Sequence, residues 1–175
     1  MPKPHIIAGT AKGRSLNTPK KGTRPSPARL REALFSILEF EPRTSFLDLF
    51  SGSGAIGLEA ASRGWQATCI DLSKAAVSVM KQNAKRLDLN AVILKDDALK
   101  FVYKSAQKFD IVFAAPPYPL DLEAIFKTIL DSNIAGQDGI YIFQHPTGLE
   151  LNLGHKPYKQ KKYGFNSLSF YSISD

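Results

Sequence analysis

The 175-residue sequence predicts an α/β protein built on a doubly wound, mainly parallel sheet. The first indication is residues 46–64, FLDLFSGSGAIGLEAASRG, where an apolar run, a glycine turn and a helix-forming run follow directly on one another. The second is the alternation of apolar runs with helix-period segments between residues 67 and 143. The third is a pair of consecutive strand-like runs, 159–163 and 167–173, which predicts an antiparallel end to the sheet.

The individual elements follow in chain order. Residues 5–9 and 12–16 predict two short strands joined by a glycine-containing turn, and prolines and basic residues predict a loop over 19–27. Ser26 is the candidate N-cap of a helix with Pro27 in its first turn and an apolar face from Leu30 to Leu38. We expect strands at 46–50, 67–70, 91–94, 109–114 and 139–143, helices at 55–61, 74–85 and 122–130, and a terminal hairpin around 164–166.

The glycine turn has the properties of a ligand-binding loop. Gly52 and Gly54 allow a ligand to approach the backbone closely, and the helix behind them begins with unpaired amide donors. With Gly57 they match the G-x-G-x-x-G dinucleotide pattern, which is a weak signal alone. Asp71 ends the next apolar run and can accept hydrogen bonds from the ribose of NAD or S-adenosylmethionine (SAM), or serve as a turn or cap residue. Asp48 has the alternative role of a structural carboxylate that bonds to the loop.

The length fits one domain, and the composition limits its surroundings. No apolar run reaches membrane-spanning length, and the first residues lack the apolar segment of a signal peptide. The single cysteine, Cys69, falls in an expected buried strand, so neither disulfides nor a cysteine metal site is indicated. We therefore expect a cytoplasmic protein without a membrane partner and without a metal.

The net charge of +7 is unevenly distributed. Residues 1–43 contain nine basic and three acidic side chains, whereas the other 132 residues contain 14 and 13. A basic arm on a nearly neutral body is typical of proteins that bind a phosphate backbone. The alternative is a solvated tail, but the glycine and aliphatic content of this arm argues against simple disorder. Glu59, on the helix behind the glycine turn, is expected at the surface or in a capping role.

The segment Ala115-Pro116-Pro117-Tyr118 follows the fourth strand directly. Two prolines hold the backbone extended and remove two donors, which leaves carbonyl oxygens fixed beside an aromatic ring. A nucleobase amine needs such acceptors for methylation because its lone pair is delocalised into the ring. The ring of Tyr118 would hold an extruded base by stacking. The alternative is a purely structural turn.

Several segments together carry a family resemblance: IIAGTAKGRSL, RPSPARLREALFSIL, DLFSGSGAIGLEAASRG, DDAL, APPY and the closing YG…LSFY. Over nearly its whole length the chain resembles the bacterial small-subunit ribosomal RNA guanine-N2 methyltransferases of the RsmD type. The resemblance implies a Rossmann-like, seven-stranded class I methyltransferase sheet with an antiparallel C-terminal strand. It also implies methyl transfer from SAM to the exocyclic N2 amine of a guanine in 16S rRNA, within the small ribosomal subunit.

The resemblance also implies roles for individual residues. Asp48 and the loop would face the methionine part of SAM, Asp71 its ribose and Asp97 with Ala98 its adenine, although Asp97 could instead cap a helix. The implied cofactor set is Asp48, Phe50, Ser51, Gly52, Ser53, Gly54, Asp71, Leu72, Asp97 and Ala98. The catalytic segment would be Ala115, Pro116, Pro117 and Tyr118, and the RNA phosphates would be held by Lys12, Arg14, Lys20, Lys21, Arg24 and Arg29. Residues 1–43 would then form a basic RNA-binding extension and 44–175 the methyltransferase core.

Two positions depart from the family pattern. Ala115 stands where an Asp or Asn is usual, and Ala28 stands where an acidic residue is usual. The first departure leaves open a homologue that binds SAM and RNA with weak or no catalysis. A DNA adenine-N6 methyltransferase is disfavoured because the short chain has no separate base-recognition domain. An NAD-linked oxidoreductase would explain the glycines and Asp71, but not the APPY segment, the basic arm or the terminal hairpin.

Overall fold

The computed structural model describes residues 3–21 and 25–173. Its helices are α1 (Ala28–Ile37), α2 (Gly57–Ser62), α3 (Lys74–Arg86), α4 (Ala98–Lys104) and α5 (Leu122–Asp131). Its strands are β1 (Ser45–Leu49), β2 (Gln66–Asp71), β3 (Ala91–Lys95), β4 (Phe109–Ala114), β5 (Ala135–Pro146), β6 (Lys159–Tyr163) and β7 (Asn166–Ser172). The order of these elements follows the alternation expected from the sequence.

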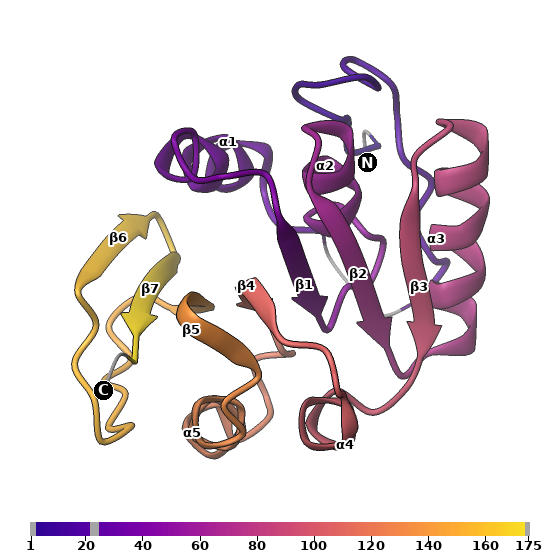
Figure 1. The fold of residues 1–175 in the computed structure, drawn as a ribbon. Helices are drawn as coiled ribbons and strands as arrows, with labels where there is room; N and C mark the ends of the chain where they lie inside the picture. The colour runs from indigo at the N-terminus through magenta and orange to yellow at the C-terminus, as the bar shows by residue number, and fades with distance from the viewer. Residues whose placement is uncertain (1–2, 22–24, 174–175) are drawn as a thin grey trace.

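The strands form one seven-stranded sheet in the order β3-β2-β1-β4-β5-β7-β6. Strands β1 to β5 are parallel, and β7 pairs antiparallel with both β5 and β6. Helices α1, α2 and α3 lie on one face of the sheet, and α4 and α5 lie on the other (Figure 1). This arrangement confirms the predicted doubly wound sheet and its antiparallel end. The strand order reverses between β1 and β4, so this is the topological switch point where ligands bind in such sheets.

Each face of the sheet has its own apolar core. On the first face, Leu34 and Phe35 of α1 pack with Phe46 of β1 in one buried cluster. On the second, the ring of Phe126 in α5 stacks on Phe143 of β5 with centroids 4.3 Å apart. Burying each of these large side chains stabilises the fold by roughly 1.5–3 kcal/mol. Helices therefore pack against both faces of the sheet that carries the candidate site.

The N-terminal pairing is shorter than the predicted hairpin. A single antiparallel bridge joins His5 to Ser15, flanked by a bond from Ile6 N to the carbonyl of Arg14 at 2.9 Å. The strands do not extend further because the next two amides, of Ile7 and Ala8, donate to the carboxylate of Glu59 rather than to a partner strand. The expected pair of strands is thus reduced to one bridge by a competing acceptor.

Glu59 is fully buried, so its expected surface or capping role is wrong. One oxygen accepts from Ile7 N at 2.7 Å and lies 3.5 Å from Nη1 of Arg31. The other accepts from Ala8 N at 3.1 Å and from Nε of Arg63 at 2.8 Å. Four donors from three parts of the chain compensate the buried charge. The carboxylate therefore attaches the N-terminal segment and α1 to α2.

Two further differences concern element ends. Pro27 occupies the N-cap position of α1 without a side-chain cap, and Ser26 does not cap the helix. Its hydroxyl instead donates to Oε1 of Gln144 at 2.8 Å. Strand β5 begins at Ala135, four residues before the predicted start, and its register against β4 shifts between Phe109 and Ile111. Two glycines in the early part of β5 weaken its strand signal in the sequence.

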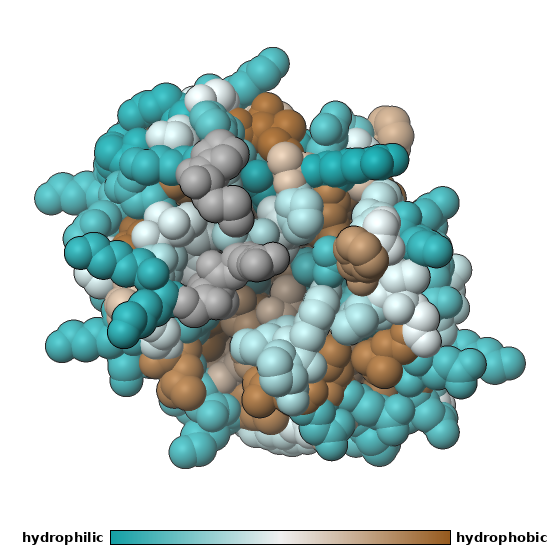
Figure 2. All heavy atoms as spheres, turned by 180° about the vertical axis from the view of Figure 1, so that it is seen from behind, coloured by the Kyte–Doolittle hydropathy of each residue, from teal (hydrophilic) through white to brown (hydrophobic). Residues whose placement is uncertain are grey.

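None of the helices in residues 3–21 and 25–173 has the length and apolar composition needed to cross a membrane. Figure 2 shows one face of the molecule, with hydrophilic side chains around most of its outline and hydrophobic residues in separate patches between them. Within the same described ranges, no three His, Cys, Asp or Glu residues group as a metal site would require.

Candidate active site

The glycine loop, Asp71 and the APPY segment meet at one edge of the sheet. Leu49 at the end of β1 pairs with Ile70 of β2 on one side and with Ala114 of β4 on the other. Because parallel strands end at the same edge, the segments that follow these three strands are neighbours there. The site lies at the topological switch point, where the loops after β1 and β4 diverge to opposite faces.

The backbone of the glycine loop has a conformation that favours glycine. Gly52 and Gly54 have φ values of +58° and +83°, in the left-handed region. A Cβ at Gly54 would lie 2.9 Å from Cγ of Met80 in α3, so this position also lacks space for a side chain. Phe50 has φ of +60° without being glycine, which marks the start of the loop as a tightly constrained turn.

Asp71 holds the loop through main-chain donors. Its Oδ2 accepts from Gly52 N at 2.8 Å, and its Oδ1 accepts from Ser73 N at 2.9 Å. The turn role considered for Asp71 is therefore present. A carboxylate accepts about four hydrogen bonds, so these two leave capacity for hydroxyl donors of a ligand. Leu72, directly after it, is an exposed apolar side chain at the same edge.

Asp48 lies under the loop rather than on its surface. Its carboxylate is buried, and Oδ2 accepts from the amide of Gly57, the first residue of α2, at 2.9 Å. Burial raises the pKa of Asp48 to about 7. A Cβ on Gly57 would overlap Sγ of Cys69 and lie 3.0 Å from Asp48 Oδ2, so the close approach of α2 to the sheet requires glycine. The structural role considered for Asp48 is therefore observed.

Asp97 caps α4, which is one of its two predicted roles. Its Oδ1 accepts from Leu99 N at 3.0 Å and from Lys100 N at 3.1 Å. Ala98, the first residue of the helix, is buried. The cap places Asp97 at the carboxyl edge of β3, next to the strand that carries Asp71.

The APPY segment is fixed by residues that the sequence did not single out. Ala115 is half-buried, Pro116 is buried, and Tyr118 is 38% exposed. The Tyr118 hydroxyl donates to Oδ1 of Asn166, at the start of β7, and accepts from Nε2 of Gln144 at 3.4 Å. Gln144 also accepts a hydrogen bond from the hydroxyl of Ser26. A chain of polar contacts thus connects the start of α1, the APPY segment and the terminal hairpin, and no local sequence pattern predicts it.

The basic residues proposed to hold RNA are divided between the two ends of the sheet. Arg14 donates to the carbonyl of Arg86 at the C-terminal end of α3, whereas Asp71, in the candidate site, accepts from Ser73 N at the N-cap of that helix. Arg29 lies in the first turn of α1, at the edge where the APPY segment lies. Lys12 is exposed two residues before Arg14, Lys20 and Lys21 are exposed on the segment that leads to α1, and Arg24 lies outside the described residues.

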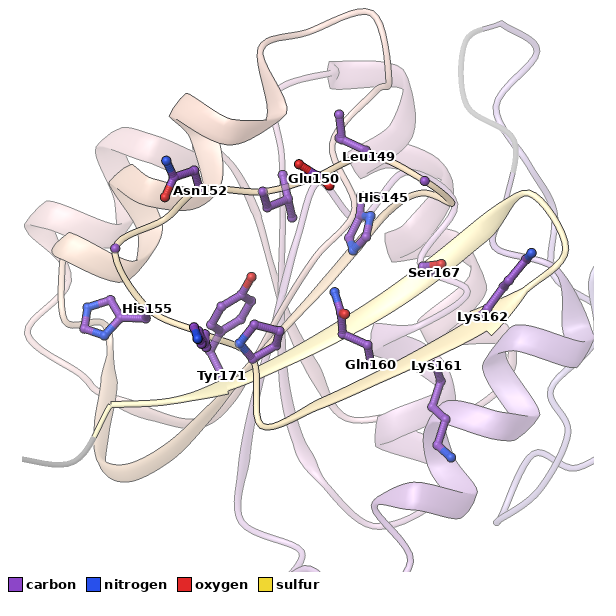
Figure 3. Close-up of a pocket in the computed structure, with 15 residues that line it drawn as sticks. His145, Leu149, Glu150, Asn152, His155, Gln160, Lys161, Lys162, Ser167 and Tyr171 are labelled. Atoms are coloured by element: carbon purple, nitrogen blue, oxygen red, sulfur yellow. The ribbon is translucent and has the colours of Figure 1, made fainter.

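An open cavity of about 940 Å³ lies beyond the APPY segment, on the face of β5, β7 and β6 that also carries α5 (Figure 3). Its floor includes buried His145, whose Nε2 lies 2.7 Å from Oγ of Ser169. Gln160 donates to the same hydroxyl at 2.8 Å. Burial lowers the pKa of His145, in keeping with a neutral structural imidazole. The lining of the cavity also includes three lysines and one glutamate: Lys156, Lys161, Lys162 and Glu150.

The strand order, the antiparallel seventh strand and the glycine loop at the switch point define the fold as that of the class I methyltransferases. The family described as Conserved hypothetical protein 95 matches residues 4–172, and the chain belongs to this family.

Named relatives agree with the resemblance seen in the sequence. The chain is 35% identical over 143 residues to Ribosomal RNA small subunit methyltransferase D of Escherichia coli K12, covering 78% of this chain and 72% of that protein. It is 32% identical over 151 residues to the protein of the same name from Buchnera aphidicola subsp. Baizongia pistaciae, covering 81% and 76%. A solved structure of a hypothetical protein from Thermus thermophilus superposes with a TM-score of 0.89 at 40% identity, covering 97% and 99%. The family resemblance is confirmed.

Proposed function

We propose that the protein transfers a methyl group from SAM to the exocyclic N2 amine of a guanine in 16S rRNA of the small ribosomal subunit. The observation that carries the proposal is the meeting of the glycine loop and the APPY segment at the switch point of this sheet. Two relatives named as small-subunit ribosomal RNA methyltransferases, each covering more than two thirds of this chain, support the same substrate class.

The residues at the edge of the sheet fit SAM. Gly52 and Gly54 have no side chains, so a ligand can approach the backbone of the loop closely. The spare hydrogen-bonding capacity of Asp71 suits a ribose diol, and exposed Leu72 offers an apolar surface to an adenine ring. Asp97 and Ala98 would border the adenine, while Asp48, Phe50, Ser51 and Ser53 would support the loop against the methionine part. SAM supplies the electrophilic methyl group when bound.

The APPY segment would orient the amine. The carbonyl oxygens around Ala115 and Pro116 would accept the amine N–H groups and so direct the nitrogen lone pair toward the methyl group. Pro117 keeps this backbone stiff, and the ring of Tyr118, held through its hydroxyl, would stack on the extruded base. Positioning and fixed dipoles would supply most of the rate. For the transfer to balance, the N–C bond would form as the methyl–sulfur bond of the sulfonium breaks, and the proton that the amine loses, held at the carbonyl oxygens of this segment, would pass to water.

Residues 1–43 would serve as the RNA-binding extension of a core formed by 44–175. The segment 5–17 is attached to α2 and α3 through Glu59 and through two hydrogen bonds between Asn17 and Asn83, so its basic side chains extend from a braced backbone. Bracing lowers the entropy lost when these side chains bind phosphates. Binding that does not weaken between low and high salt would contradict this role.

The experiment is methyl transfer from labelled SAM to unmethylated small ribosomal subunits, with free 16S rRNA and DNA in parallel. An Ala115→Asp variant forms a second arm, because it restores a side-chain acceptor for the amine. A charge-assisted hydrogen bond of roughly 1.5–3 kcal/mol predicts about ten- to a hundredfold faster single-turnover transfer, with little change in SAM affinity.

The outcomes separate the candidate functions. Methyl label in RNA after reaction with the unsubstituted protein supports the proposed RNA methyltransferase. Label only with Ala115→Asp would identify a homologue that binds SAM and RNA without effective catalysis. Label only in DNA would indicate a DNA adenine-N6 methyltransferase instead. Thermal stabilisation by NAD and not by SAM would indicate an NAD-linked oxidoreductase.

A further inference from the structure

The turn between β6 and β7 exposes a phenylalanine. Phe165 is 92% exposed, and only Phe40, at 97%, is more exposed among the large apolar residues of the described ranges. Single exposed apolar side chains are common on protein surfaces, so exposure alone identifies no site. The position and the support of this ring are what distinguish it.

The turn adjoins the candidate active site. Asn166, the next residue, accepts a hydrogen bond from the hydroxyl of Tyr118 in the APPY segment. Asn166 also pairs with Pro146, at the carboxyl end of β5, so the turn lies at the same edge of the sheet as the switch point (Figure 1). A nucleotide beside a base held on Tyr118 would therefore be near Phe165.

The backbone of the turn is braced. Thr147 N donates to the carbonyl of Phe165 at 2.8 Å, and the Thr147 hydroxyl donates to the carbonyl of Gly164 at 2.9 Å. The same hydroxyl lies 2.9 Å from Oγ of Ser167. A ring on a fixed turn loses less conformational entropy when a base stacks on it than a ring on a free loop does.

Two lysines of β6 lie within four residues of Phe165, with Lys162 paired to Ser167 and Lys161 to Leu168. Both lysines precede Phe165, and Figure 3 shows their side chains leaving the strand in opposite directions. In residues 3–21 and 25–173, neither lysine pairs with a carboxylate. Lysines on an edge strand also discourage aggregation, which accounts for the charges but not for an exposed phenyl ring beside them.

We propose that the β6–β7 turn is a second RNA contact, in which Phe165 stacks on a base neighbouring the target guanine and Lys161 and Lys162 bind phosphates on either side. The proposal rests on the proposed function. An aromatic ring between cations is the combination that binds single-stranded nucleic acid, because the ring accepts the face of any base and the cations follow the backbone.

The test measures dissociation constants for unmethylated small subunits and for free 16S rRNA. Phe165→Ala is expected to weaken binding to both by roughly 5- to 150-fold, the range for loss of one stacked base. Phe165→Trp keeps a stacking surface and should bind at least as tightly as the natural sequence. Phe40→Ala removes an equally exposed ring at the far end of α1 and should leave binding within twofold.

The lysines are tested through salt dependence. Replacing both Lys161 and Lys162 by glutamine should lower the slope of log K against log salt by about 1.4, since each phosphate contact on a single strand contributes about 0.7. Lys127→Gln, on the exposed side of α5, is the matched control and should leave the slope unchanged. Melting temperature and SAM binding, measured for every variant, establish that each one is folded.

Several results would overturn the inference. The first is an RNA affinity of Phe165→Ala equal to that of the unsubstituted protein. The others are a loss of RNA affinity in Phe40→Ala, or in Phe165→Trp, as large as the loss in Phe165→Ala. Weakened binding to assembled subunits but not to free 16S rRNA would show that the ring contacts a ribosomal protein instead. Failure of the proposed function is seen separately, as absence of methyl transfer by the natural sequence and by Ala115→Asp.

Discussion

Replacing Glu59 by glutamine is expected to destabilise the fold by about 3 kcal/mol, because the side chain compensates two arginines in a buried position. Removing one partner of a buried ion pair costs about 3–5 kcal/mol, since the remaining charge stays desolvated. Arg31 is fully buried here, whereas Arg63 reaches solvent and lies over the ring of Phe35, which lets it relax. The lower end of the range is therefore expected.

Urea unfolding measures this loss directly. With a denaturant slope of about 2 kcal/mol/M, the midpoint should fall by roughly 1.5 M. Glu39→Gln is the matched control, because Glu39 pairs with Arg43 at 4.0 Å on the surface and should contribute less than about 0.5 kcal/mol. Hydrogen exchange should show faster loss of the Ile7 and Ala8 amide protons in Glu59→Gln. A loss below about 1 kcal/mol, or equal losses in the two variants, would refute the role given to Glu59.

Three further predictions concern the site. Because Asp48 has a pKa of about 7 in the fold and about 4 when unfolded, the folded state binds the extra proton, and stability should fall by up to about 4 kcal/mol as pH rises from 4 to 7. Asp48→Asn should flatten this slope, and a natural protein whose melting temperature is constant over that range would contradict it. Gly57→Ala should cost about 1–3 kcal/mol in calorimetry by overlapping Cys69, whereas Gly136→Ala, whose Cβ meets only ordinary contacts, should cost under 1 kcal/mol. Tyr118→Phe should retain most of the single-turnover methyl-transfer rate, and Tyr118→Ala should lower that rate at least tenfold. Equal losses in the two variants would show that the reaction needs the hydroxyl rather than the ring.

Features that are local in the sequence could be predicted, and features that depend on distant partners could not. The glycine loop, Asp71 and the APPY segment each combine residue type with a position directly after an apolar run, so their common edge follows from strand order. The burial of Glu59 depends on donors that are distant in the sequence: Arg31, 28 residues away, and Ile7, 52 residues away.

The supports of the APPY segment illustrate the same limit. Ser26 has the residue type and position of an N-cap, but its hydroxyl finds an acceptor 118 residues further along the chain. Gln144 reaches Tyr118 only because β5 lies beside β4 in the sheet. Side-chain hydrogen bonds of this range leave no periodic signal in the sequence, so only the folded arrangement reveals them.

The most direct test of the central claim is identification of the methylated nucleoside. Small subunits treated with the protein and labelled SAM are digested to nucleosides and analysed by mass spectrometry, and the label is then mapped to a position in the RNA. The account predicts one labelled position, and the nucleoside there should be N2-methylguanosine. Label on a different nucleoside, or on many positions at similar levels, would contradict the role assigned to the site.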